Sequence, residues 1–158
     1  MPVTPITAAP FILEHPSVII GDQLTGVAID CAGTNLTVGV DQDETTYETY
    51  CGSYTTYKPP KWTITFTLVQ SYGAGSTWEL IHPLCGTAQP FAIKPDIATA
   101  SVDNPVMTGT CLVKQLPFID APPGEASEID LELKVQGQPV WGETDPTTTS
   151  TQSEAAAA

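Results

Sequence analysis

Residues 61–69, KWTITFTLV, decide the fold class of this chain. Four large apolar residues alternate there with three threonines: Trp62, Ile64, Phe66 and Leu68. Successive side chains of a β-strand point to opposite faces, so this period of two predicts a strand with one buried face and one polar face. Residues 128–135, EIDLELKV, show the same alternation, with a fully apolar face and a fully charged face. Both segments favour a mainly β fold.

Short strands are also predicted on either side of these two segments. They cover SVIIG at 17–21, LTGVAID at 24–30, TNLTVGV at 34–40, QPFAIKP at 89–95 and VMTGTCLVKQLPF at 106–118. Loop composition marks FIDAPPGEAS, at 118–127, as the connection before the last strand, and QGQPVW, at 136–141, as a turn after it. Trp141 is expected to be a late aromatic anchor.

STWELIHPLCG, residues 76–86, is the one segment that predicts a helix. Ser76 can cap the N-terminus, and Glu79 stands where a capping box places its carboxylate. Trp78 and Ile81 are one turn apart and can face the sheet. Pro83 should end the helix, because proline disfavours helical geometry in the residue before it, here His82.

Residues 41–61, DQDETTYETYCGSYTTYKPPK, combine four tyrosines with threonines and a cluster of acids. Threonine and tyrosine favour strands, so a long hairpin or protruding β-loop is expected. The tyrosines are Tyr47, Tyr50, Tyr54 and Tyr57. Tyrosine suits an interface between subunits, since its ring is apolar and its hydroxyl stays hydrated. The alternative is an ordinary strand pair with surface tyrosines.

The predicted organisation is one β domain flanked by two segments without a core. Residues 1–16 contain four prolines and should form an extended arm. Residues 17–142 should form a β-sandwich or barrel with one short α-helix on its side. Residues 143–158 are polar and threonine-rich, which predicts a flexible tail.

The chain is strongly acidic, with a formal net charge of −13 from 18 acidic residues and 5 lysines, and it contains no arginine. Sequence-specific DNA-binding proteins depend on arginine side chains and basic patches, so specific nucleic-acid binding is not expected. The acidity serves either solubility alone or a surface that must not adhere to a passing anion. No stretch of about 18 apolar residues is present and the N-terminus does not resemble a secretory signal, so we expect cytoplasmic synthesis.

Chemistry-bearing motifs are not found in this sequence. The spacing of Cys31, Cys51, Cys85 and Cys111 matches no zinc or redox pattern, and free, mostly buried thiols are expected. His15 and His82 stand in no metal-binding motif. Asp41, Asp43 and Glu44 begin like a calcium loop, but the later ligands are missing. We therefore expect no catalytic residue, no cofactor and no metal, although a small β-barrel enzyme with an unrecognised site remains an alternative.

Residues 106–141 resemble the C-terminal part of the major tail tube proteins of long-tailed phages, in particular the strand, the GEAS loop and the amphipathic strand that closes on VQGQP. The order of elements upstream is similar too, so the resemblance covers about residues 17–141. It implies a tail-tube β-sandwich that assembles into stacked hexameric rings in the virion tail, with the block from Asp41 to Lys61 reaching a neighbouring subunit. We favour a non-contractile tail.

The resemblance also implies partners and an acidic lumen. The partners are other copies of the chain, a tape measure protein, a tail terminator and distal tail proteins, while DNA passes without specific binding and no membrane is involved. Glu128, Asp130 and Glu132 are the candidates for lumen-facing acids, because they line one face of one strand; an outward solvated face is the alternative. A capsid decoration protein or an immunoglobulin-like adhesin module is the other function that fits the composition.

Overall fold

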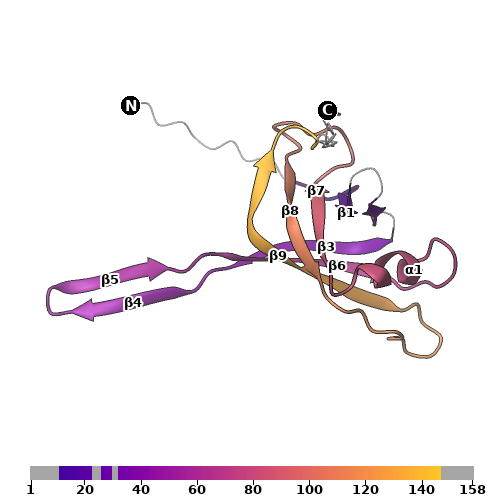
Figure 1. The fold of residues 1–158 in the computed structure, drawn as a ribbon, viewed down its shortest axis with the longest axis horizontal. Coiled ribbons are helices and arrows are strands. Elements are labelled where there is room, and N and C mark those ends of the chain that lie inside the picture. The colour runs from indigo at the N-terminus through magenta and orange to yellow at the C-terminus, as the bar shows by residue number, and fades with distance from the viewer. Residues whose placement is uncertain (1–10, 23–25, 30–31, 147–158) are drawn as a thin grey trace, which may run out of the picture.

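The structure is a computed structural model and describes residues 11–22, 26–29 and 32–146. Strands dominate, as the sequence predicts, and they form one antiparallel sheet of seven strands in the order β2-β1-β7-β8-β9-β6-β3, which curls into a half-barrel (Figure 1). The seven strands are β1 (Ser17–Ile20), β2 (Val27–Ala28), β3 (Gly33–Asp41), β6 (Lys61–Val69), β7 (Ala88–Lys94), β8 (Val106–Val113) and β9 (Glu128–Gly142). The strands β4 (Glu44–Thr49) and β5 (Gly52–Tyr57) form a separate hairpin.

The pairing of β6 with β9 brings together the two alternating segments of the sequence. Phe66 lies opposite Leu131, and Ile64 lies opposite Leu133. These four side chains are all buried, and the intervening threonines and carboxylates point to the other face of the sheet. One face of the curled sheet is therefore apolar and carries the core, and the other face is polar.

The core collects apolar side chains from β1, β6, β7, β8 and β9 on the apolar face. Ile81 of the helix α1 (Thr77–Ile81) joins this cluster and is 1% exposed, so the helix covers part of the sheet as predicted. Packing is close where the start of β3 pairs with β6, because a Cβ atom at Gly33 would overlap the ring of Phe66. Phe66 thus fills the space that glycine leaves open.

The N-terminal cap of the helix is as predicted, but the end of the helix and the contacts of Trp78 differ from the prediction. Ser76 accepts a hydrogen bond from the Glu79 amide at 3.2 Å, and the Glu79 carboxylate accepts one from the Gly75 amide at 2.5 Å. His82 keeps right-handed helical dihedrals, contrary to prediction, because the chain continues as a 3-10 turn over His82–Leu84 that holds Pro83 in its first turn. Trp78 does not join the core under the sheet but stacks on His82.

The segment 136–141 is not a turn, contrary to prediction, because β9 continues through it to Gly142. The register between β8 and β9 shifts between Thr108 and Thr110, so residues 137–139 form a bulge. Gly137 adopts a φ of 78°, which bends the strand, and Pro139 lies in the bulge, where the lack of an N–H is tolerated. The strand then brings Trp141 edge-on to Trp62, with ring centroids 5.8 Å apart.

Residues 11–16 of the predicted arm form neither helix nor strand. Residues 1–10, most of the predicted tail from 147, and Cys31 lie outside the described residues. Among those described, no helix is long and apolar enough to cross a membrane. The division into arm, domain and tail stays a prediction.

Replacing Phe66 with Ala should lower the free energy of unfolding by about 3–5 kcal/mol, because it removes a buried aromatic ring and leaves a cavity against Gly33. Urea denaturation followed by tryptophan fluorescence measures this change. Phe11→Ala is the matched control, since Phe11 is 68% exposed and its loss should cost much less. Equal losses from the two substitutions would contradict the packing described above.

Candidate self-assembly surfaces

The β4–β5 hairpin projects from the body as the predicted long β-loop (Figure 1). It continues the direction of β3 and β6 and turns at Tyr50 and Cys51, where the Thr49 hydroxyl donates to the Gly52 carbonyl at 2.8 Å. Apart from the half-buried Thr45, every residue of its two strands is exposed. An isolated two-stranded hairpin is at best marginally stable in water, so contact with another chain would stabilise this hairpin.

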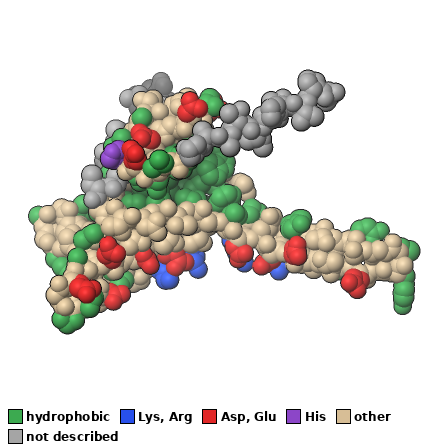
Figure 2. Space-filling view, turned by 180° about the vertical axis from the view of Figure 1, so that it is seen from behind, with side chains coloured by type: hydrophobic (Ala, Val, Ile, Leu, Met, Phe, Trp, Pro, Cys, Tyr) green, Lys and Arg blue, Asp and Glu red, His purple; other side chains and the backbone are tan. Residues whose placement is uncertain are grey.

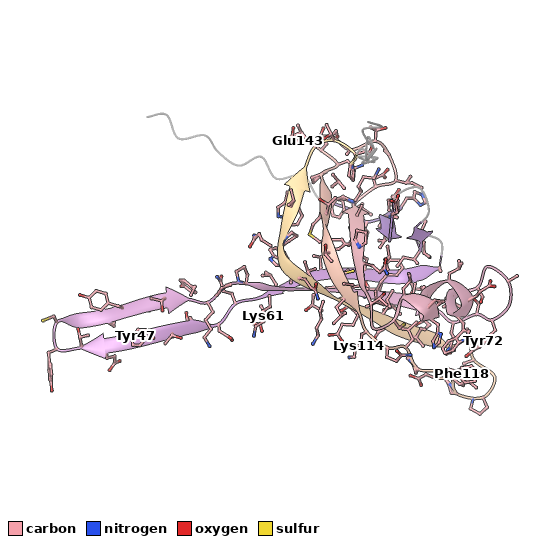
Figure 3. The ribbon with its side chains drawn as sticks, in the orientation of Figure 1. Tyr47, Lys61, Tyr72, Lys114, Phe118 and Glu143 are labelled. Atoms are coloured by element: carbon pink, nitrogen blue, oxygen red, sulfur yellow. The ribbon has the colours of Figure 1, made fainter. Side chains whose placement is uncertain are left out.

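The hairpin has one uncharged face and one acidic face. Tyr47 and Tyr54 lie directly opposite each other across the two strands. Because side chains alternate, the same face carries the threonines at 45, 49 and 56. We call this the tyrosine face, and Figure 3 shows Tyr47 on it.

The other predicted interface tyrosines lie elsewhere on the hairpin. Tyr57 is paired with Glu44 on the opposite face, which also carries Glu48. Tyr50 stands at the tip and is fully exposed. The structure therefore brings together only two of the four tyrosines singled out in the sequence.

Ion pairs and a hydrogen bond join the two sides of the hairpin at its base. The Asp43 carboxylate lies 3.7 Å from the Lys58 ammonium and 3.8 Å from that of Lys61. Gln42 Nε2 donates to the Lys58 carbonyl at 2.9 Å. Asp43 thus pairs with lysines, and no group of three potential metal ligands occurs among the described residues.

The predicted lumen-facing acids lie on the polar face of the sheet. Asp130 accepts a hydrogen bond from the Thr67 hydroxyl at 2.7 Å, and Glu128 is exposed at the start of β9. Glu132 is 2.6 Å from the Lys114 ammonium and 3.9 Å from that of Lys134. The hydrogen bond from Lys114, aided by the charges of both lysines, holds the pKa of Glu132 below its usual value.

This polar face therefore has mixed charge, which the spacing of the acids alone does not reveal. Figure 2 shows acidic and basic side chains lying together along one side of the molecule. We call the surface formed by Thr63, Thr65, Thr67, Lys114, Glu128, Asp130, Glu132 and Lys134 the polar sheet face.

An aromatic patch occupies the end of the molecule away from the hairpin, and sequence reasoning missed it. Trp78 stacks on His82 at 4.2 Å between ring centroids and meets Phe118 edge-on at 5.0 Å. Tyr72 meets Phe118 edge-on at 5.7 Å (Figure 3). We define the aromatic patch as these four rings together with the exposed Ile119.

The residues weighed for catalysis are engaged in other contacts. The His82 ring lies against Trp78, and Cys85 Sγ donates to the Ile81 carbonyl at 3.5 Å. The three described cysteines are free, but only Cys111 is buried, whereas Cys51 is exposed at the hairpin tip and Cys85 is intermediate. The expectation of mostly buried thiols is thus wrong for Cys51.

No family model and no curated protein sequence matches the chain. Chains of several solved structures share its fold, including the following two. One is a chain of the virion of a native gene transfer agent particle, with 14% identity and a TM-score of 0.54 over 79% of this chain and 95% of that one. The other is a chain of the sheath/tube terminator of PVC, an extracellular contractile injection system, in the extended state, with 12% identity and a TM-score of 0.57 over 87% of this chain and 99% of that one. These likenesses establish the fold.

Replacing Lys114 with Met should raise the pKa of Glu132 toward its ordinary value, because the hydrogen bond that lowers it is lost together with the charge. Carboxyl-carbon NMR titration measures this, and Lys61→Met serves as the control. The lowered pKa stabilises the folded state above the pKa of unfolded glutamate, and that contribution disappears as pH falls through the folded value. An unchanged pKa in the Lys114 variant would show that the ion pair does not form.

Native thiol labelling should distinguish Cys51 from Cys111. Burial raises the pKa of Cys111 to about 11, so its reactive thiolate is scarce near neutral pH, whereas Cys51 is exposed. With Cys31 and Cys85 replaced by Ser, one thiol should react with maleimide at pH 7 and a second should react only in denaturant. Peptide mapping by mass spectrometry identifies each site, and rapid native labelling of Cys111 would contradict its burial.

Proposed function

We propose that this chain is a structural, non-enzymatic subunit of a phage tail-type particle that works by assembling with copies of itself. The observation that carries the proposal is the hairpin, whose two strands pair mainly with each other and leave every residue except Thr45 exposed. The fold likeness to chains of a gene transfer agent virion and of a contractile injection system supports the same class. The strand β3 adds support, since it is an edge strand of nine residues, and edge strands can pair with another chain.

In its specific form, the proposal is a tail tube. Six copies form a ring, rings stack into a tube around a tape measure protein, and a terminator and distal tail proteins bind its ends. The chain is made and assembled in the host cytoplasm and resides in the virion tail. The ring number and these partners come from the sequence resemblance to major tail tube proteins.

Within such a tube, the polar sheet face is the surface that would line the lumen. Its threonines and charged groups suit contact with water, and the opposite face of the same strands is occupied by the core. Lys114 and Lys134 offset part of the charge of Glu128, Asp130 and Glu132. DNA would then pass over a hydrated surface with a small excess of acidic groups and no arginine, and screening over about 10 Å would further weaken each contact.

A second candidate is a terminator that closes the end of a tube. The likeness to the sheath/tube terminator chain favours it, since that match covers 87% of this chain. The same likeness, to a contractile system, gives no support to a non-contractile tail in particular. A tube subunit should polymerise to variable lengths, whereas a terminator should stop at single rings.

The alternative of a decoration protein or adhesin module depends on the oxidation state of the cysteines. An oxidised extracellular module would be expected to carry disulfides. Cys51, Cys85 and Cys111 are free thiols in the structure. This favours the assembly subunit over the adhesin.

Purified protein should form rings or tubes visible by negative-stain electron microscopy. Replacing Tyr50 and Tyr54 with Ser should reduce the number of particles while leaving the melting temperature nearly unchanged, because both side chains are exposed on the hairpin. Val102→Ser is the control, since Val102 is also exposed but lies in the loop between β7 and β8. Tyrosine variants that assemble like the wild type would contradict the role of the hairpin in assembly. A protein that stays monomeric at every protein and salt concentration would contradict self-assembly.

A further inference from the structure

The aromatic patch is an exposed apolar surface that is already fixed in place. Phe118 and Ile119 are 60% and 67% exposed, and Tyr72 is 51% exposed. Exposed clusters of this kind mark interaction sites in soluble proteins, and aromatic residues are enriched in interface cores.

Hydrogen bonds hold the loop that carries Phe118. Gln70 Nε2 donates to the carbonyls of Pro117 and Phe118, at 3.4 and 2.7 Å, and the Tyr72 hydroxyl also donates to the Phe118 carbonyl. The Ser127 hydroxyl donates to Gln70 Oε1 at 2.7 Å. A partner would therefore meet a preorganised surface and would lose little entropy in ordering it.

The aromatic patch and the hairpin stand at opposite ends of the long axis of the molecule (Figures 1 and 3). They cannot meet within one copy. When a second copy is displaced along this axis, its hairpin points toward the patch of the first. A contact between two different surfaces is head-to-tail, and its repetition generates rings or filaments.

Charge selects which face of the hairpin can dock there. Glu79, Asp120 and Glu125 lie on the helix and loop that carry the patch. The hairpin face with Glu44 and Glu48 would bring like charges together, which disfavours binding. The tyrosine face is uncharged, and its ring pair of Tyr47 and Tyr54 matches the aromatic character of the patch.

We propose that the tyrosine face of one copy docks on the aromatic patch of the next copy. This inference rests on the proposed self-assembly and names the two surfaces that meet in it. The receptor on the neighbouring subunit is built from α1, from the residues on either side of it that carry Tyr72 and His82, and from the loop that precedes β9.

Cross-linking from the native Cys51 tests this contact. In a background with Cys31 and Cys85 replaced by Ser, Ile119→Cys places a second exposed thiol on the patch, and a short bis-maleimide is added to the assembled protein. A head-to-tail contact joins Cys51 of each copy to the patch of the next, so a ladder of covalent multimers is expected on a denaturing gel. Val102→Cys is the matched control and should give no ladder, and Cys51→Ser should abolish the ladder of the Ile119 variant.

A mixing experiment provides a second, independent test. Tyr54→Glu places a charge on the tyrosine face, and Phe118→Glu places one on the aromatic patch. Each variant alone should therefore sediment as a monomer. The mixture retains one intact hairpin and one intact patch, and it should form a one-to-one dimer in sedimentation velocity.

The outcomes separate this inference from the proposed function. Wild-type particles seen by electron microscopy without a ladder from the Ile119 variant, or without a dimer in the mixture, would overturn the hairpin–patch contact and leave self-assembly intact. Wild-type protein that forms no particle, no ladder and no mixed dimer would overturn self-assembly itself. A ladder together with a mixed dimer supports the contact.

Discussion

The antiparallel pairing of β6 with β9 is the contact on which the rest of the molecule depends. Its register sets Ile64 against Leu133 and Phe66 against Leu131, so the alternating apolar side chains of residues 64–68 and 129–133 reach the same face. A slip by one residue would move that whole apolar set to the polar face. The same register brings Thr67 to Asp130 on the polar side, so the core and the polar sheet face are two consequences of one pairing.

The hairpin is joined to this central pair through β6, because β3 ends at Asp41 and β6 begins at Lys61, on the two sides of its base. The ion pairs of Asp43 with Lys58 and Lys61 are exposed and each contributes little stability. The direction of the hairpin is instead set by β3 and β6, from which it extends. A hairpin fixed in this way can present the tyrosine face at a defined place on a neighbouring subunit. The preorganised aromatic patch offers a receptor at the opposite end of the molecule.

The sequence was sufficient to predict the strands whose pattern is local. The alternation of residues 61–69, the capping box of Ser76 with Glu79 and the tyrosine-rich hairpin were all predicted correctly, because each depends on neighbours within one element. Errors arose where tertiary pairing overrode local signals: Gly137 and Pro139 indicate a turn, yet a bulge opposite Gly109 keeps them in β9. The aromatic patch could not be predicted, since its rings come from separate segments joined by hydrogen bonds to the Phe118 carbonyl. Likewise, the neutralisation of Glu132 by Lys114 depends on the register of β8 against β9.

We propose that this fold functions by repeated contact between copies through the hairpin. Cryo-electron microscopy of the assembled protein, at a resolution that traces strands, tests it most directly. We expect closed rings in which each hairpin lies on the helix and loop of the adjacent subunit, with the polar sheet face directed to the central channel. Rings whose hairpins project freely into solvent, with the polar sheet face on the outside, would contradict it.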